Sequence, residues 1–256
     1  MSSALTRYGL PLVLPIAILT TWAVLTANGE SFYWPPLADI IPRIWSLWFV
    51  ENFQSDFLPS LWRVLASWTL ACGIGVVAGI VTGSLPVVRD LLNPLANFLR
   101  AIPAAALIPF TILAFGIGDT AKVFVITFVA VWPVFINTMD GVDEIDPGLV
   151  QAARAFRISP ARRLFGVVLP AAAPRIATGM RTSLAIAVIV MLISEMVAST
   201  NGIGLVTIQA QRTFQTVDMW AGILVLGILG FVLNFIFQRV ERRLLRWNFD
   251  SKRLGV

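Results

Sequence analysis

Apolar residues fill six long runs of the chain, and polar or charged residues gather between these runs. Each run approaches or exceeds the length of about 20 residues that a helix needs to cross a bilayer. The predicted spans are residues 10–27, 60–85, 91–118, 120–139, 179–197 and 219–237. We therefore expect an all-α polytopic membrane protein with about six transmembrane helices in one domain, residues 1–256. Residues 10–27 could instead be a signal peptide, but the run is long for one and no good cleavage site follows it.

Prolines interrupt the middle of this pattern. The third span, 91–118, is expected to be broken by Pro94, Pro103 and Pro109, with Arg100 near its inner end. Irregular backbone at membrane depth is tolerated only beside protein or a water-filled cavity, so this span is a candidate wall of a translocation pathway. The alternative is a kinked packing helix. Residues 86–89 are expected to form a short cytoplasmic turn, and Pro133 to interrupt the fourth span.

Two further stretches have a specific spacing. Gly75, Gly79 and Gly83 stand four residues apart, so they share one helix face and allow a neighbouring helix to approach closely. Residues 28–59 form an external connection with an amphipathic helix at the membrane interface. Its apolar positions are Ile40, Ile41, Ile44, Trp45, Leu47 and Trp48.

Charge distribution gives an orientation. The chain is 57% hydrophobic and only 13% charged, against roughly a quarter in soluble domains, which confirms the class. Cations are few on one side, namely Arg43, Lys122 and Arg212. They are concentrated in the central loop, 140–178, and the tail, 238–256. The positive-inside rule therefore predicts that both termini are cytoplasmic, and the net charge of +5 does not indicate nucleic-acid binding.

Several kinds of chemistry are excluded by composition. The chain has no histidine and one cysteine, Cys72, so it offers neither a His-assisted nucleophile nor the usual zinc site. Gly116 to Lys122 fails as a phosphate loop, because Ala121 replaces its second glycine and Val123 its Ser or Thr. We expect no enzyme activity, no metal and no cofactor bound by this chain. An intramembrane enzyme is thereby disfavoured.

The central loop contains two helix-start signals. Asp146 before Pro147, and Ser159 before Pro160, each combine an N-cap residue with proline at the first helical position. Between them, Leu149, Ala153 and Phe156 share a helical face, which we expect to be an apolar docking face. Clustered arginines make the segment basic: Arg154, Arg157, Arg162 and Arg163. Residues 146–178 thus predict a helix–turn–helix pair at the cytoplasmic surface.

This loop resembles the EAA loop of bacterial ABC importer permeases. Gln151-Ala152-Ala153 stands where that motif has Glu-Ala-Ala, and Leu169-Pro170 closes it. Two positions depart from it: Gln151 replaces Glu, and Arg157 occupies the position of a glycine that would ease the turn. Either Arg157 turns at some cost in energy or the Ser159-Pro160 start supplies the turn.

The resemblance covers nearly the whole chain after the first span. It is similar to permeases of nitrate, sulfonate, taurine and bicarbonate importers, and closest to the aliphatic sulfonate type. The matching residues are Ser60-Leu61-Trp62-Arg63, Arg100-Ala101-Ile102-Pro103, Pro109, Phe115-Gly116-Ile117-Gly118, Asn137-Thr138, Glu195, Asn201-Gly202-Ile203-Gly204, Gln215-Thr216, Glu241-Arg242 and Arg246-Trp247.

The resemblance implies a type I-like importer fold with cytoplasmic coupling helices in the bacterial inner membrane. Two permease copies, most simply a homodimer, would assemble with two ATP-binding subunits that hold ATP and Mg²⁺, and with an external solute-binding protein. The coupling helix would lie in or near residues 155–164. The implied coupling residues are Gln151, Ala152, Ala153, Ala155, Phe156, Arg157, Ile158, Ser159, Arg162, Arg163 and Leu164.

Substrate and gate remain open at this point. A small anion, most simply a sulfonate, fits the resemblance, while a vitamin or pyrimidine precursor is an alternative, as is a secondary transporter without an ATPase. Candidate pathway or gate residues are Arg100, Pro103, Pro109, Glu195 and Asn201. A charge such as Glu195 in an apolar span usually faces a cavity or a partner. We expect it to line the outer gate or to pair with Arg63 or Arg212, unless it is a solvated interfacial carboxylate.

Overall fold

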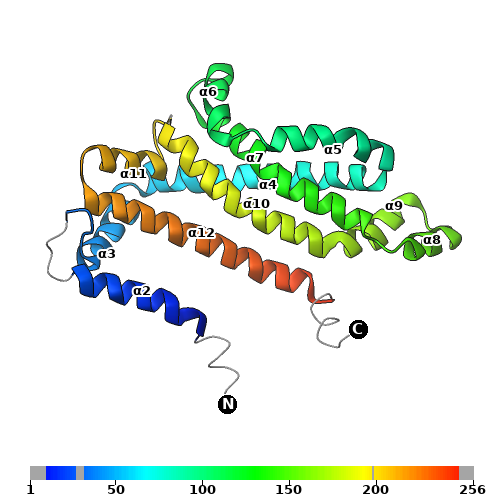
Figure 1. The fold of residues 1–256 in the computed structure, drawn as a ribbon, viewed down its shortest axis with the longest axis horizontal. Helices are drawn as coiled ribbons and strands as arrows, with labels where there is room; N and C mark the ends of the chain where they lie inside the picture. The colour runs from blue at the N-terminus through cyan, green and yellow to red at the C-terminus, as the bar shows by residue number, and fades with distance from the viewer. Residues whose placement is uncertain (1–9, 27–31, 198, 248–256) are drawn as a thin grey trace, which may run out of the picture.

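The computed structural model describes residues 10–26, 32–197 and 199–247, and in these ranges helices form all of the regular structure (Figure 1). Three long helices lie side by side at the centre: α4 (Leu58–Ser84), α7 (Asp119–Asp143) and α10 (Leu169–Val197). A fourth, α12 (Thr216–Leu244), packs along α10 and α3 (Leu37–Trp45). The predicted all-α class is therefore confirmed.

Four helical stretches of the described chain are long and apolar enough to cross a membrane. They are Phe53–Ser84, Asp119–Asp143, Pro160–Val197 and Thr216–Leu244. A fifth crossing exists if the bent pair Pro86–Arg100 and Ala104–Phe115 counts as one span. The first predicted span corresponds to α2 (Leu10–Thr26), whose 17 residues are at the lower limit for a crossing and border residues outside the described ranges. The described residues thus give four or five spans rather than the expected six.

The third predicted span is a pair of helices joined at a right-angle bend rather than a single kinked helix. Helices α5 (Pro86–Arg100) and α6 (Ala104–Phe115) meet at an angle of 91°. Only Pro103 breaks the chain, because it stands in extended backbone before α6. Pro94 and Pro109 lie inside continuous helices, so the expected breaks there are wrong. Arg100 consequently lies at the bend and not near the inner end of a span.

Two other proline-based expectations are also wrong. Residues 86–89 are the first turn of α5 rather than a loop, since Pro86 has no N–H to lose at a helix start. The chain reverses instead at Leu85, which is extended. Pro133 lies inside α7, which continues unbroken to Asp143. The packing of α7 against α4 and α10 holds the helix through this position.

The glycine face of α4 is confirmed, and its partner is α7. A Cβ atom added at Gly75, Gly79 or Gly83 would lie 2.7, 2.6 or 2.7 Å from Val134, Thr138 or Met139 atoms of α7. Such distances leave no room for a side chain, so the three glycines let the two backbones approach closely. This contact aligns α4 with α7 along most of their length.

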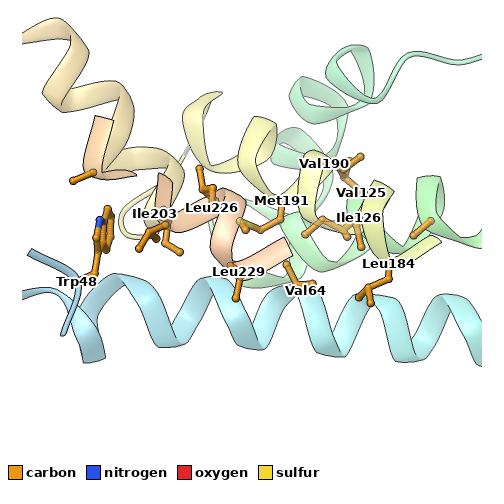
Figure 2. Packing of buried hydrophobic residues seen from close by; sticks show 14 of the residues in the cluster. Trp48, Val64, Val125, Ile126, Leu184, Val190, Met191, Ile203, Leu226 and Leu229 are labelled. Atoms are coloured by element: carbon orange, nitrogen blue, oxygen red, sulfur yellow. The ribbon is translucent and has the colours of Figure 1, made fainter. Parts of the chain in front are cut away.

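The apolar core joins α4, α7, α10, α11 (Ile203–Arg212) and α12 (Figure 2). Trp48, in the π-helical segment Ser46–Glu51, is fully buried beside these helices, and so is Ile40 of α3. The predicted amphipathic helix around residues 40–48 therefore exists. Its Ile40 and Trp48 face the protein core rather than the membrane surface.

An ion pair fastens this external segment to α12. Arg43 donates from Nε and Nη2 to the Asp218 carboxylate at 2.6 and 3.0 Å, and from Nη1 to Glu51 at 2.7 Å. The hydrogen bond with Asp218 raises the pKa of the Arg43 guanidinium above its ordinary value. A bidentate pair of this kind fixes orientation as well as contributing energy.

The central loop continues directly into the fifth span. Helix α8 (Pro147–Ala155) is followed by α9 (Pro160–Arg163), the π-helical segment Leu164–Val168 and then α10. The span therefore begins well before residue 179, and the expected second loop helix is only its first turns. The end of α12 lies in the half of the molecule that carries α8 and α9, and the start of α2 lies nearer to that half than the end of α2 does (Figure 1).

Candidate functional site

A buried ion pair lies at the end of the bundle opposite to α8 and α9. Arg63 of α4 is 1% exposed and Glu195 of α10 is 0% exposed. The Arg63 Nη1 atom lies 2.6 Å from Glu195 Oε1. Of the two partners expected for Glu195, the structure pairs it with Arg63, while Arg212 is exposed. Burying both charges is costly unless every lone pair and proton is used, so their other contacts matter.

The Glu195 carboxylate accepts two further donors. Ser60 Oγ lies 2.8 and 2.9 Å from its two oxygens, and the Gly204 N–H donates to Oε2 at 3.0 Å. Hydrogen bonds to a charged acceptor are the stronger kind in proteins. Glu195 is therefore held as the centre of a network rather than exposed to a cavity or to solvent.

The first residues of α11 supply three consecutive backbone donors to this site. Gly202 N–H donates to Asp56 Oδ1 at 2.7 Å, Ile203 N–H to Ser60 Oγ at 2.9 Å, and Gly204 N–H to Glu195. A helix leaves its first N–H groups without partners and carries partial positive charge at that end. The Asp56 and Glu195 carboxylates and the Ser60 hydroxyl accept these N–H groups, and the two carboxylates also balance the partial positive charge.

Arg63 uses its remaining donors on two other segments. Nε donates to Asp119 Oδ1 at 2.8 Å, at the start of α7, and Nη2 donates to Asn201 Oδ1 at 2.5 Å. Nη1 also reaches the Asn201 carbonyl at 3.1 Å. We call Asp56, Ser60, Arg63, Glu195 and Asn201 the buried polar network, together with Asp119 at its edge, whose side chain is 58% exposed. It ties α4, α7, α10 and the start of α11 to one another.

Glycine is required where this network meets the backbone. Gly202 has φ 126°, a region that side chains disfavour, and a Cβ there would collide with the Glu195 carboxylate. A Cβ on Gly204 would lie 2.8 Å from Glu195 Cβ. The Asn201-Gly202-Ile203-Gly204 motif therefore has a physical explanation: it lets the start of α11 close around Glu195.

The structure does not bring all the candidate gate residues together. Asn201 and Glu195 share the network, whereas Arg100, Pro103 and Pro109 are exposed on the bent α5–α6 pair. Arg100 Nε donates to Asn97 Oδ1 at 3.1 Å. Sequence reasoning missed Asp56 and Asp119 as partners of the network. Both are ordinary loop or helix-start carboxylates in sequence, and only the fold brings them to Arg63.

The Arg-rich loop, residues 146–163, is built at the opposite end. Asp146 caps α8 as expected, accepting from Gly148 N–H at 2.7 Å. Ser159 stands at the N-cap of α9 but makes no side-chain capping bond. The turn falls on Arg157, whose φ is 53°. Ile158 N–H bonds to Ala153 O and Arg157 N–H to Arg154 O, which is a Schellman ending with arginine in the place that favours glycine.

Exposure divides the residues of this loop. Ala153 is 5% exposed, so it packs within the chain and cannot belong to an apolar docking face, contrary to expectation. Phe156 is 82% exposed, and Leu149 is also exposed. Of the implied coupling residues, Gln151, Ala152, Ala155, Arg157, Ile158, Ser159 and Arg162 are exposed as well, while Arg163 and Leu164 are half-buried.

Neither end is arranged for covalent or metal chemistry. Within residues 10–26, 32–197 and 199–247, no group of three or more Cys, Asp or Glu side chains could hold a metal ion. The buried polar network consists of ion pairs and hydrogen bonds that join helices. Such a network can lock one arrangement of helices, and rupture of the network would permit another.

Comparisons with known proteins converge on one family. Residues 73–246 match the family described as binding-protein-dependent transport system inner membrane component. SsuC of Bacillus subtilis, named as an aliphatic sulfonates transport permease, is 30% identical over 94% of this chain and 89% of its own. The bicarbonate transport system permease protein CmpB of Synechococcus elongatus is 34% identical over 93% and 89%.

A solved structure supports the same fold. An inward-facing form of the MetNI methionine ABC transporter superposes with a TM-score of 0.66 at 22% identity. The match covers 73% of this chain and 93% of that one. At this identity the likeness concerns the fold alone. It places the present helices in the arrangement of an importer permease.

Proposed function

We propose, from the premise that this chain belongs to the family of binding-protein-dependent transport system inner membrane components, that it moves a small anion into the cell by alternating access. The chain is a permease subunit of an ABC importer, and it is a transport subunit rather than an enzyme. Membership of this family replaces the secondary-transporter alternative. The match over residues 73–246 is the observation that carries the proposal.

The Arg-rich loop is the proposed contact with the ATP-binding subunits, which hold ATP and Mg²⁺. Two features support this assignment. Phe156 projects from the end of α8 with 82% of its surface exposed, and arginines surround it. The loop also runs without interruption into α10, since one continuous helical stretch covers Pro160–Val197. A displacement of the loop is therefore transmitted directly along a membrane-spanning helix.

The buried polar network is the proposed lock at the other end of α10. Glu195 lies near the last residue of that helix and is bonded to α4 and α11. Movement of α10 would have to break or carry these contacts as a unit. Packed interfaces of this kind switch between discrete arrangements rather than deform continuously. ATP-driven motion of the loop would thus shift the lock between two states, one with the contacts of Glu195 intact and one with them broken.

The proposed solute is an organic or inorganic oxyanion, most simply a sulfonate. The relatives named above carry aliphatic sulfonates or bicarbonate in their names, and both are small oxyanions. A vitamin or pyrimidine precursor is the second candidate, because specificity in such importers rests largely on the external binding protein. A homodimer of this chain, two ATP-binding subunits and cytoplasmic termini complete the proposal.

The test is purification of the chain from its native membranes in mild detergent, with mass spectrometry of the proteins that accompany it. We expect an ATP-binding subunit in near-equal amount, and a solute-binding protein whose own ligand identifies the substrate class. Assembly without any ATP-binding subunit, with uptake into vesicles that contain no ATP, would overturn the importer proposal. A binding protein that prefers an uncharged vitamin would overturn the proposed anionic substrate and leave the importer proposal standing.

A further inference from the structure

Lys122 is a buried cation outside the contacts of the network. It lies in the first turn of α7 and is 4% exposed, and its Nζ has no hydrogen-bond partner among the described residues. Burying an ammonium group without a partner is costly. The nearby charges do not satisfy it directly, because Glu195 and Asp119 direct their bonds to Arg63. Something outside this set of contacts is needed to explain the residue.

Lys122 is one of the residues that line a small cavity. Ile108 and Thr111 of α6, Gly118 and Ala121 at the start of α7, and Ser194 of α10 line it with Lys122. Its volume of about 10 Å³ is enough for about one water molecule. Lys122 also stands in the first turn of α7, where a helix carries partial positive charge. An ammonium group beside a helix N-terminus is a combination that favours an anion.

Helix α6 covers this cavity and is bounded by two breaks. Before it lies the 91° bend at Pro103, and after it Gly116 has φ 77° with open space around its Cβ position. Its buried side presents Ile108 and Thr111 to the cavity, while Leu113 on the other side is 88% exposed. The helix is thus a short cover between two hinges, and its displacement would open the cavity toward a solute.

We propose that Lys122 binds the anionic group of the transported solute once α6 has moved aside, and so acts as a specificity-determining residue of the pathway. The inference rests on the proposed import of an oxyanion, and it adds the residue that meets the charge. As it stands the cavity is too small for a sulfonate or a bicarbonate ion. The bound state therefore requires the displacement of α6, and Lys122 is shielded from other ions until then.

The experiment measures anion binding by the importer purified with its ATP-binding subunits, both without nucleotide and with ATP and Mg²⁺, so that the conformations of its cycle are sampled. Sodium methanesulfonate and sodium bicarbonate are titrated at constant ionic strength, and binding is followed by the unfolding temperature and tryptophan fluorescence. We expect saturable binding to the wild type and an apparent Kd at least tenfold higher for Lys122→Met, with Lys122→Arg within about threefold of the wild type. Arg212→Met is the matched control, because it removes an exposed cation, and it should bind as the wild type does.

Two results would overturn the inference: no saturable anion effect in the wild type, or equal binding by Lys122→Met. If Lys122→Met does not fold, Thr111→Val decides, since it keeps the charge and changes the cavity wall. An altered preference between the two anions then supports the site, and an unchanged preference and affinity sink it. Uptake by the assembled importer separates the two proposals. A wild type that imports no anion rejects the proposed function, whereas equal uptake by Lys122→Met rejects only the role of Lys122.

Discussion

At the scale of the residue, the Arg63–Glu195 pair is the interaction with the largest expected effect on stability. Removing the charge from one member of a buried pair leaves the other uncompensated, which costs about 3–5 kcal/mol. Glu195→Gln should therefore lower the free energy of unfolding by roughly 3 kcal/mol, as measured by denaturation of the detergent-solubilised protein. Ser60 and Gly204 would lose a charged partner at the same time.

Glu144→Gln is the matched control for that change. Glu144 also pairs with an arginine, Arg175, at 2.6 Å, but both side chains are more than half exposed. Solvent screens such pairs, and they contribute about 0.2–1 kcal/mol. Equal losses of stability in the two variants would show that burial does not set the strength of the Glu195 contacts.

Arg157 provides a second prediction at this scale, in which the substitution increases the free energy of unfolding instead of lowering it. Its φ of 53° places a side chain in the left-handed region, which costs L-residues about 1–2 kcal/mol. Arg157→Gly should raise the free energy of unfolding by about 1 kcal/mol. Arg154→Gly, inside α8, should lower it by about 0.5–1 kcal/mol, since glycine weakens a helix interior. A loss in both variants would mean that the Arg157 side chain makes a compensating contact.

At the scale of the element, the glycine face of α4 is the feature that sequence alone predicted best. Gly75, Gly79 and Gly83 are spaced four residues apart, so they share one face of the helix whichever helix packs against it. Gly79→Ala should cost about 1–3 kcal/mol, because its Cβ would lie 2.6 Å from Thr138 Cβ and 2.8 Å from Phe135 O. Gly73→Ala on the same helix meets nothing within 4 Å and should be neutral or stabilising. Thermal unfolding of both variants separates the two effects.

The prolines show the limit of such local reasoning. Pro94, Pro103, Pro109 and Pro133 have the same chemistry, but only Pro103 interrupts a helix. A proline removes one backbone hydrogen bond, and whether the helix continues depends on the packing around it. The sequence shows where a backbone hydrogen bond is lost, but it does not show how the helix is packed at that position. The same reason explains why Ala153 was placed on an outward face: periodicity identifies a face without saying which way it points.

The contacts of the buried polar network lie further beyond sequence. Arg63 and Glu195 are 132 residues apart, and Arg63 and Asp119 are 56 apart. The cost of burying Glu195 indicated a partner, and it reduced the choice to two arginines. Only the arrangement of α4, α7, α10 and α11 could select Arg63 and add Asp119 and Ser60.

At the scale of the whole molecule, the two ends of α10 have different proposed tasks, coupling at one end and the lock at the other, which mutations can separate. The Arg-rich loop lies at one end of the bundle (Figure 1) and most of its residues are exposed. Arg63 and Glu195, at the centre of the buried polar network, are 1% and 0% exposed. A change confined to the loop should therefore affect assembly and leave the stability of the subunit intact. Phe156 is the residue to change, because its ring is 82% exposed and its replacement removes surface available to a partner without removing a contact of the fold.

Phe156→Asp should reduce the ATP-binding subunit that co-purifies with this chain at least tenfold, because a charge on an apolar anchor at the centre of an interface is poorly tolerated. Membrane insertion and unfolding temperature should stay unchanged. Phe156→Leu should retain most of the partner, and Tyr33→Asp, which is 71% exposed at the opposite end, should retain all of it. Full recovery of the ATP-binding subunit with Phe156→Asp would place the coupling contact elsewhere on the chain. Loss with Tyr33→Asp as well would point to a general effect of added charge on assembly.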